Sequence, residues 1–239
     1  MQLLKATVDL AFPRNCIHCK GIVDSSDYDF LCSACEQEII PCNSPACNIC
    51  GYPFFGDTLG VKSCPQCAEL SPLFDRGKTL FIAKGVGRSL IHELKYRNGL
   101  YILSDLSKLV MQSKHYLEYI ANTILVPVPL HPTRLRERGF NQSEHIAKML
   151  ANCSSENIKV ESLLTRRQYT QSQTSLNRSE RYQNVKNAFT LAPDAVLAST
   201  KPYVLIDDVF TTGSTLNACA HVLRAAGVHQ IKVATIGHG

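Results

Sequence analysis

Residues 203–215, which read YVLIDDVFTTGST, place two carboxylates beside a turn of small hydroxylated residues. The carboxylates are Asp207 and Asp208. The turn consists of Thr211, Thr212, Gly213, Ser214 and Thr215. Backbone N–H groups at a helix N-terminus bind phosphate, and hydroxyl groups add further donors. Carboxylates accept hydrogen bonds from the vicinal hydroxyls of a sugar. The pattern therefore predicts a site for a ribose that carries a phosphate on its 5-carbon.

Two other interpretations fit the same residues. Paired aspartates are also common ligands of a metal ion, and Asp208 alone could serve as a helix N-cap.

The elements that flank the turn have the patterns needed to position it. Residues 203–206 form an apolar run that is typical of a strand buried on both faces of a parallel sheet. After the turn, apolar residues recur with helical spacing as far as Gly227, a residue suited to a helix C-terminus. We expect the acidic pair to follow the end of the strand and the turn to begin the helix.

Eight of the eleven cysteines form four C-x-x-C pairs, a spacing that suits metal binding. The pairs are Cys16/Cys19, Cys32/Cys35, Cys47/Cys50 and Cys64/Cys67. Two such pairs supply the four thiolates of a tetrahedral zinc site. We expect two structural Zn²⁺ sites formed by consecutive pairs, with a cross-braced arrangement as the alternative. Disulfides or a redox motif are further alternatives, but without a secretory signal we predict a cytoplasmic protein with reduced thiols.

Charge and composition divide the 239 residues at the same place. Residues 1–75 carry four Lys and Arg against nine Asp and Glu, whereas residues 76–239 carry 21 against 11. We predict a zinc-binding module at 1–75, in which metal replaces a large apolar core, and an α/β domain at 76–239. The basic balance of the second part suits phosphorylated ligands, including nucleic acid.

The α/β part shows several further patterns. Residues 79–83 and 124–130 predict strands, the second entering a proline-stiffened loop, and residues 88–96, 100–111 and 115–120 have helical spacing. The following segment is interpreted as an anion-binding basic turn, with Ser143 as the cap of the next helix. That turn carries Arg134, Arg136 and Arg138.

Two other segments give predictions of a different kind. Residues 163–189 are too polar for a core and predict a mobile lid over an anionic site. The first 13 residues predict an amphipathic helix rather than a signal peptide or membrane span.

Together these motifs resemble the ComF family over nearly the whole chain. VLIDDVFTTGST is similar to the phosphoribosyl pyrophosphate (PRPP) motif of type I phosphoribosyltransferases. The other matching elements are the four cysteine pairs, LKYRNG, VPVPLHPTRLRERGFNQSEHIA, and a spaced pattern made of Thr170, Gln173, Leu176, Arg181, Asn184 and Val185. The resemblance implies a type I phosphoribosyltransferase fold, a central parallel sheet flanked by helices and covered by a flexible hood, preceded by a Cys₄ zinc-ribbon-like domain.

The resemblance also implies roles for individual residues. Asp207 and Asp208 would hold the ribose hydroxyls, residues 211–215 would cradle the 5-phosphate, and the loop at 127–130 would lie near the pyrophosphate with Mg²⁺. The 163–189 segment would be the hood. The implied cations that neutralise pyrophosphate are Lys95, Arg138 and Arg181.

Two functions follow from this resemblance. In the first, the protein transfers 5-phosphoribosyl to an unidentified acceptor during natural transformation, the uptake of single-stranded DNA. In the second, it is a non-catalytic competence adaptor with PRPP as a regulatory ligand. The adaptor would bind DNA through its phosphates, or would bind a partner protein, either a helicase or a recombination mediator. Residue 2 is Gln, so the catalytic cysteine of a glutaminase half does not follow the initiator Met.

Overall fold

The computed structural model describes residues 14–23, 26–55, 63–96, 99–154, 156, 158–167, 188–197 and 200–239. The helix predicted at 1–13, Arg181 and the other residues of the spaced pattern around it lie outside these ranges.

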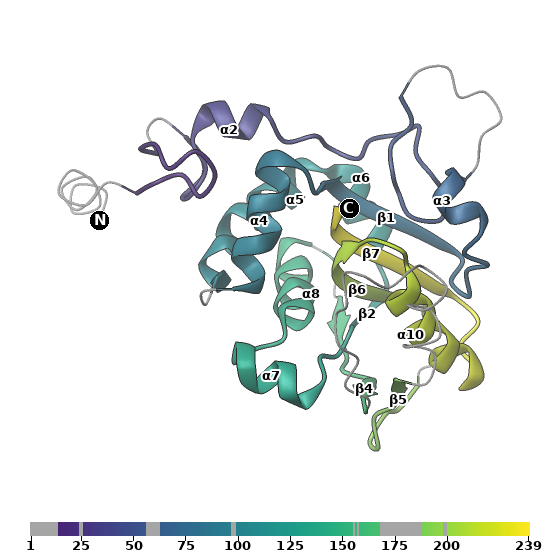
Figure 1. Ribbon diagram of the computed structural model, residues 1–239. Helices are drawn as coiled ribbons and strands as arrows, with labels where there is room; N and C mark the ends of the chain where they lie inside the picture. Colours follow the sequence, from purple (N-terminus) through teal and green to yellow (C-terminus); the bar gives the residue numbers. More distant parts are fainter. Residues whose placement is uncertain are drawn as a thin grey trace.

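A five-stranded parallel sheet forms the centre of the molecule, in the order β1-β7-β6-β2-β3 (Figure 1). Its strands are β1 (Arg76–Ile82), β2 (Ile124–Pro127), β3 (Lys159–Val160), β6 (Tyr203–Phe210) and β7 (Ile231–His238). The middle strand β6 is covered on both faces, and Val204, Leu205 and Ile206 are each fully buried. This burial explains why their apolar run does not alternate with polar residues.

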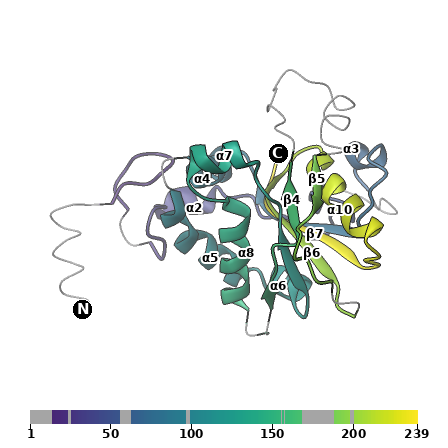
Figure 2. The same cartoon turned by 90° about the horizontal axis from the view of Figure 1, so that it is seen from below.

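Helices cover both faces of the sheet (Figure 2). The first face packs against α4 (Gly85–Lys95), α5 (Leu103–Gln112), α6 (Lys114–Ile120) and α8 (Gln142–Cys153). The second face packs against α10 (Ser214–Ala225) and an antiparallel hairpin of β4 (Leu164–Arg166) and β5 (Phe189–Leu191). The short elements are α2 (Ser33–Gln37), α3 (Pro65–Ala68), η1 (Gly99–Ile102) and α7 (Pro132–Arg138). The predicted α/β architecture is confirmed.

The cysteine-rich part packs onto the sheet domain at two places. Cys16, Cys32 and Cys35 belong to the apolar core of the first face, whereas the later four cysteines belong to the core of the second face. Between them the chain runs antiparallel to β1, where Ile82 N donates to Ile40 O and Cys42 N donates to Leu80 O, each at 2.9 Å. This segment covers the edge strand of the sheet. A domain boundary at residue 75 stays a prediction.

Four local expectations were wrong or incomplete. The strand of the acidic motif does not end at Ile206 but continues to Phe210, because β7 pairs with it through His238 while β2 ends opposite Ile206. Asp207 and Asp208 therefore lie in the part of β6 that is flanked by β7 on one side but no longer by β2 on the other. The predicted basic turn is the helix α7, on which Arg134 and Arg138, four residues apart, share one face and Arg136 lies on another.

The other two corrections concern helix and lid boundaries. The helix predicted to be capped by Ser143 begins two residues earlier, with Asn141 as its cap: the Asn141 side chain accepts from Ser143 N at 3.1 Å. The two ends of the predicted lid form the β4–β5 hairpin, where Leu164 and Phe189 are buried. Residues 168–187 lie outside the described ranges.

Candidate functional site

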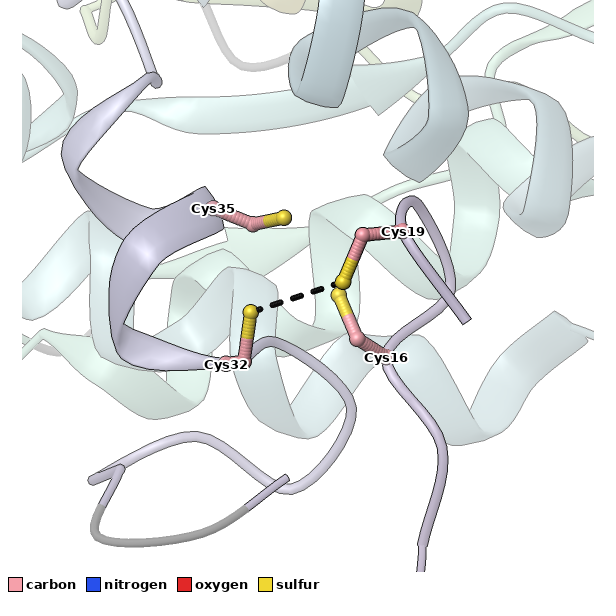
Figure 3. Close-up of side chains that lie close together, drawn as sticks. All are labelled: Cys16, Cys19, Cys32 and Cys35. Atoms are coloured by element: carbon pink, nitrogen blue, oxygen red, sulfur yellow. Dashed lines mark hydrogen bonds between the residues drawn. The ribbon is translucent and has the colours of Figure 1, made fainter. Parts of the chain in front are cut away.

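The eight paired cysteines form two separate groups of four. One group consists of Cys16, Cys19, Cys32 and Cys35, and the other of Cys47, Cys50, Cys64 and Cys67. Within each group the four sulfur atoms all lie within 4.8 Å of one another. Figure 3 shows the first group, in which two side chains from the N-terminal knuckle meet two from the start and first turn of α2. Consecutive pairs thus form each group, as predicted, and the cross-braced alternative is wrong.

The sulfur spacing fits a tetrahedral zinc ion. Zinc–sulfur bonds of about 2.3 Å in a tetrahedron give sulfur–sulfur separations of about 3.8 Å. The Sγ atoms of Cys19 and Cys32 are 3.7 Å apart, and those of Cys50 and Cys64 are 3.8 Å apart. Both groups therefore fit structural zinc sites of the Cys₄ type. All four cysteines of the second group are buried, whereas Cys19 of the first is exposed.

The first zinc site is anchored to α5 by a buried carboxylate. Asp105 is fully buried and accepts hydrogen bonds from the backbone N–H groups of Asp29 and Phe30, at 2.7 and 2.8 Å. Burial raises the pKa of Asp105, an effect that these two donors oppose. The loop between the two ligand pairs of this site is thereby held on the first face of the sheet.

The acidic pair lies on β6 beyond the last residue paired with β2, at the carboxyl edge of the sheet. Asp208 is buried, and its Oδ2 atom lies 3.1 Å from Nζ of Lys95 at the end of α4. The two groups form an ion pair without hydrogen-bond alignment, so among the described residues this oxygen has no hydrogen-bond donor. The same oxygen is inaccessible to solvent, so Lys95 supplies the counter-charge of a buried carboxylate.

Asp207 has a different set of partners. Its Oδ1 atom accepts hydrogen bonds from Ser143 Oγ and from Asp208 N, each at 3.0 Å. The residue as a whole is half-buried. Burial and the adjacent charge of Asp208 raise the pKa of Asp207 to about 7, although Lys95 and the two donors oppose the shift.

This raised pKa leads to a prediction about stability. The pKa of Asp207 is about 7 in the folded chain and ordinarily 3.8. Between these values only the folded chain keeps the proton, so the stability that Asp207 contributes falls as the pH rises from about 4 to about 7. Asp207→Asn removes this dependence. After allowance for solvent screening, we expect the variant to gain on the order of 1 kcal/mol relative to wild type between pH 5 and pH 8. Urea unfolding of both proteins at the two pH values measures the difference, and an equal difference at both would contradict the shift.

The hydroxyl-rich turn joins β6 to α10 and begins the helix, as predicted. Gly213 is the N-cap, with φ of 75°, a backbone conformation that side chains rarely adopt. Thr212 Oγ1 lies 2.9 Å from Ser214 Oγ, so the two hydroxyls form one polar cluster beside the helix N-terminus. Since α10 begins at Ser214, neither acidic residue caps it, and the N-cap interpretation of Asp208 is wrong.

The predicted cations are partly brought together. Lys95 reaches Asp208 directly. Arg138 lies at the end of α7, where its guanidinium donates to Gln142 Oε1 at 2.8 Å and stacks 5.6 Å from the centre of the Tyr96 ring. Because Tyr96 follows Lys95 in the chain, Arg138 lies beside the C-terminal end of α4. Arg181 lies outside the described residues.

Sequence reasoning missed three residues that position this site. Ser143 holds Asp207, Gln142 holds Arg138, and Asn141 Nδ2 donates to Val128 O at 3.1 Å in the loop after β2. Gln142 and Ser143 are both buried. Their signal was a run of three polar residues that opens a helix after a strand and loop. Only Asn141 is needed to cap the helix, so the polar side chains of Gln142 and Ser143 indicate a further role.

Comparison with known proteins identifies the zinc ribbons and the family of the chain. Residues 7–68 match the family model of the double zinc ribbon domain. Competence protein F of Haemophilus influenzae is 31% identical over 228 residues, which cover 93% of this chain and 96% of that protein. The chain belongs to the ComF family. The resemblance found in the sequence motifs is thereby confirmed.

Other members of the ComF family are also similar over most of their length. DNA utilization protein YhgH of Escherichia coli is 30% identical over 210 residues, which cover 85% of this chain and 88% of that protein. Competence protein ComFC of Streptococcus pneumoniae is 30% identical over 206 residues, which cover 80% of this chain and 86% of that protein. Among solved structures, a purine phosphoribosyltransferase from Pyrococcus horikoshii aligns with a TM-score of 0.33 at 15% identity, over 56% of this chain and 70% of that one. In the described part of this ComF chain, no helix combines the length and apolar character needed to cross a bilayer.

Proposed function

We propose that this ComF protein binds PRPP at the carboxyl edge of β6 and acts in natural transformation. One observation carries the proposal: an acidic pair, Asp207 and Asp208, lies on the strand that leads directly into a hydroxyl-rich turn at the N-terminus of α10. A ribose 5-phosphate group needs these two features on adjacent parts of one site. The site follows the general rule that α/β sheets bind ligands outside the carboxyl ends of their strands.

In this proposal each group has a separate task. Asp207 and Asp208 accept hydrogen bonds from the ribose hydroxyls, and the turn at 211–215 binds the 5-phosphate with N–H groups and hydroxyls. Lys95 and Arg138 face the pyrophosphate. Carboxylate and pyrophosphate oxygens are the ligands that Mg²⁺ prefers. When bound, this ion neutralises charge on the pyrophosphate.

If an acceptor is present, the reaction is a phosphoribosyl transfer. The bond from C1 of the ribose to the pyrophosphate oxygen breaks, pyrophosphate leaves with the electron pair, and a nucleophile on the acceptor forms the new bond to C1. The protein contributes positioning and charge: the cations Lys95 and Arg138 stabilise the negative charge that develops on the leaving group.

The proposed place in transformation comes from the relatives, whose names describe competence and DNA utilization. Single-stranded DNA is the partner that suits this role, with a competence helicase or recombination mediator as a protein partner. The helix α7 supports the DNA contact, because Arg134, Arg136 and Arg138 lie on it and none of its residues is buried. Such a surface would bind phosphates rather than bases.

Titration calorimetry of the zinc-loaded protein with PRPP and Mg²⁺ tests the proposal. We expect saturable binding by wild type and a loss of affinity of about 100-fold or more in Asp207→Asn/Asp208→Asn, since both acceptors of the ribose hydroxyls lose their charge. Glu144→Gln is the matched control, because Glu144 is a surface carboxylate on α8 that pairs with Lys148 at 2.6 Å. It should bind PRPP as wild type does.

Absence of binding to folded, zinc-loaded wild type would overturn the PRPP proposal. The adaptor function would then be the better account. It predicts binding to a single-stranded oligonucleotide that weakens steeply as salt is raised.

A further inference from the structure

The phosphate turn of the proposed site rests against the second zinc ribbon. A Cβ atom placed on Gly213 would lie 2.8 Å from Cδ2 of Leu70 and 2.7 Å from Cζ of Phe210. Leu70 follows the last ligand of the second zinc site, and its N–H donates to Cys67 O at 3.1 Å. The residue that caps α10 thus packs directly on the segment that leaves this zinc site.

The helix behind the turn is joined to the same segment by hydrogen bonds. Asn217, in the first turn of α10, is buried and accepts from Leu73 N through its Oδ1 atom at 2.7 Å. Further along the helix, Arg224 Nε donates to Leu73 O at 2.9 Å, and its guanidinium pairs with Asp75. These polar contacts fix the position of α10 relative to residues 70–75.

A column of rings provides a second connection between the zinc ribbon and the turn. The ring of Phe210, the last residue of β6, stacks on His238 with centroids 5.4 Å apart and planes inclined by 18°. His238 in turn contacts the ring of Tyr52, with centroids 4.8 Å apart. Tyr52 N donates to the sulfur of Cys50 at 3.4 Å. His238 is buried, and within the described ranges its ring nitrogens have no hydrogen-bond partner, so packing holds it in place.

The first zinc site has no comparable connection to the turn among the described residues. Its contacts are to helices on the opposite face of the sheet, where His18 Nδ1 lies 2.9 Å from Ser89 Oγ of α4 and Asp105 of α5 holds the ligand loop. The two zinc sites therefore differ in what they support, although their ligands are the same.

We propose that the second zinc ribbon positions the phosphate turn, with Leu70 and the Tyr52–His238–Phe210 column as its positioning residues. Zinc at this site holds the Leu70–Gly213 contact and the ring column in place. When the zinc is lost, the N–H groups of the turn no longer keep the arrangement that a phosphate monoester requires. The inference rests on the proposed phosphoribosyl function and adds a specific role for one of its two metal sites.

Leu70→Ala tests this role, with Leu31→Ala as the control. Leu31 is a fully buried leucine of the first zinc ribbon and packs in the core of the other face. Both variants are titrated with ribose 5-phosphate below their unfolding temperatures and at a verified content of two zinc ions. We expect Leu70→Ala to weaken binding about tenfold or more, since small displacements of preorganised donors are costly, and Leu31→Ala to leave it nearly unchanged.

Equal affinities in wild type and Leu70→Ala, or equal losses in both variants, would overturn the inference. Tyr52→Leu provides a second test that leaves Leu70 in place, and it should also weaken binding. Amide hydrogen exchange at residues 211–215 gives a readout that needs no ligand. If wild type binds neither PRPP nor ribose 5-phosphate, the proposed function fails, but faster exchange at the turn in Leu70→Ala and not in Leu31→Ala would still support the positioning role. Unchanged exchange in Leu70→Ala would refute it.

Discussion

Replacing Cys50 by serine is expected to reduce the zinc content from two ions per chain to one and to destabilise the sheet domain as a whole. Cys50 is fully buried, and its zinc site belongs to the apolar core of the second face. Binding of a structural zinc ion contributes on the order of 10 kcal/mol to the folded state, comparable to the entire stability of a small domain. We therefore expect the unfolding transition of Cys50→Ser to broaden and to shift to much lower temperature.

Two other cysteine variants show how zinc content and stability depend on which cysteine is replaced. Cys153→Ser removes a cysteine outside both zinc groups and should keep two zinc ions and a nearly unchanged melting temperature. Cys19→Ser removes the exposed ligand of the first site and should lose one zinc ion with a smaller loss of stability. Metal analysis and thermal unfolding measure both quantities. Retention of two zinc ions by Cys50→Ser would contradict the assignment of its site.

Lys95→Met should destabilise the protein by about 2–3 kcal/mol, because it leaves the buried Asp208 carboxylate without its counter-charge. The ammonium and carboxylate are 3.1 Å apart, with side-chain exposures of 23% and 4%. Partial exposure of Lys95 lets water screen the pair, so we expect less than the cost of breaking a fully buried one. Urea unfolding near pH 8 measures the change.

A double-mutant cycle separates the ion pair from simple packing. Lys95→Met/Asp208→Asn should recover most of the lost stability, since neither charge is then left alone. Lys148→Met is the control: its ammonium lies 2.6 Å from Glu144, closer than in the Lys95 pair, but both side chains are exposed. We expect no measurable change there. Strictly additive effects of Lys95→Met and Asp208→Asn would show that the two residues do not interact.

The zinc-loaded protein is the state in which both the PRPP and DNA proposals should be tested. Since each apolar core contains cysteines of one zinc site, a preparation that has lost metal would fail to bind ligands for a structural reason. Measured zinc content is therefore the first control of every binding experiment on this protein.

Local patterns in the sequence determined the two cysteine groups and the hydroxyl-rich turn. Two cysteines separated by two residues lie on one knuckle turn, and the intervals between the pairs allowed consecutive knuckles to share an ion. The strand–turn–helix motif from Tyr203 onward was likewise readable, because its apolar run and its small turn residues are adjacent in the chain. Strand length was misjudged at Ile206, since whether a strand continues depends on its neighbours, here β7.

Only the tertiary structure decided which side chains meet the acidic pair. Ser143 reaches Asp207 from 64 residues away, and Lys95 reaches Asp208 from a helix that precedes both. A parallel sheet brings the carboxyl ends of strands and the helices beside them to one edge, and no local pattern encodes which of these residues come within reach. The contact of Leu70 with Gly213 arises in the same way. A zinc ribbon that is separate in sequence thereby packs against the turn that we propose binds phosphate.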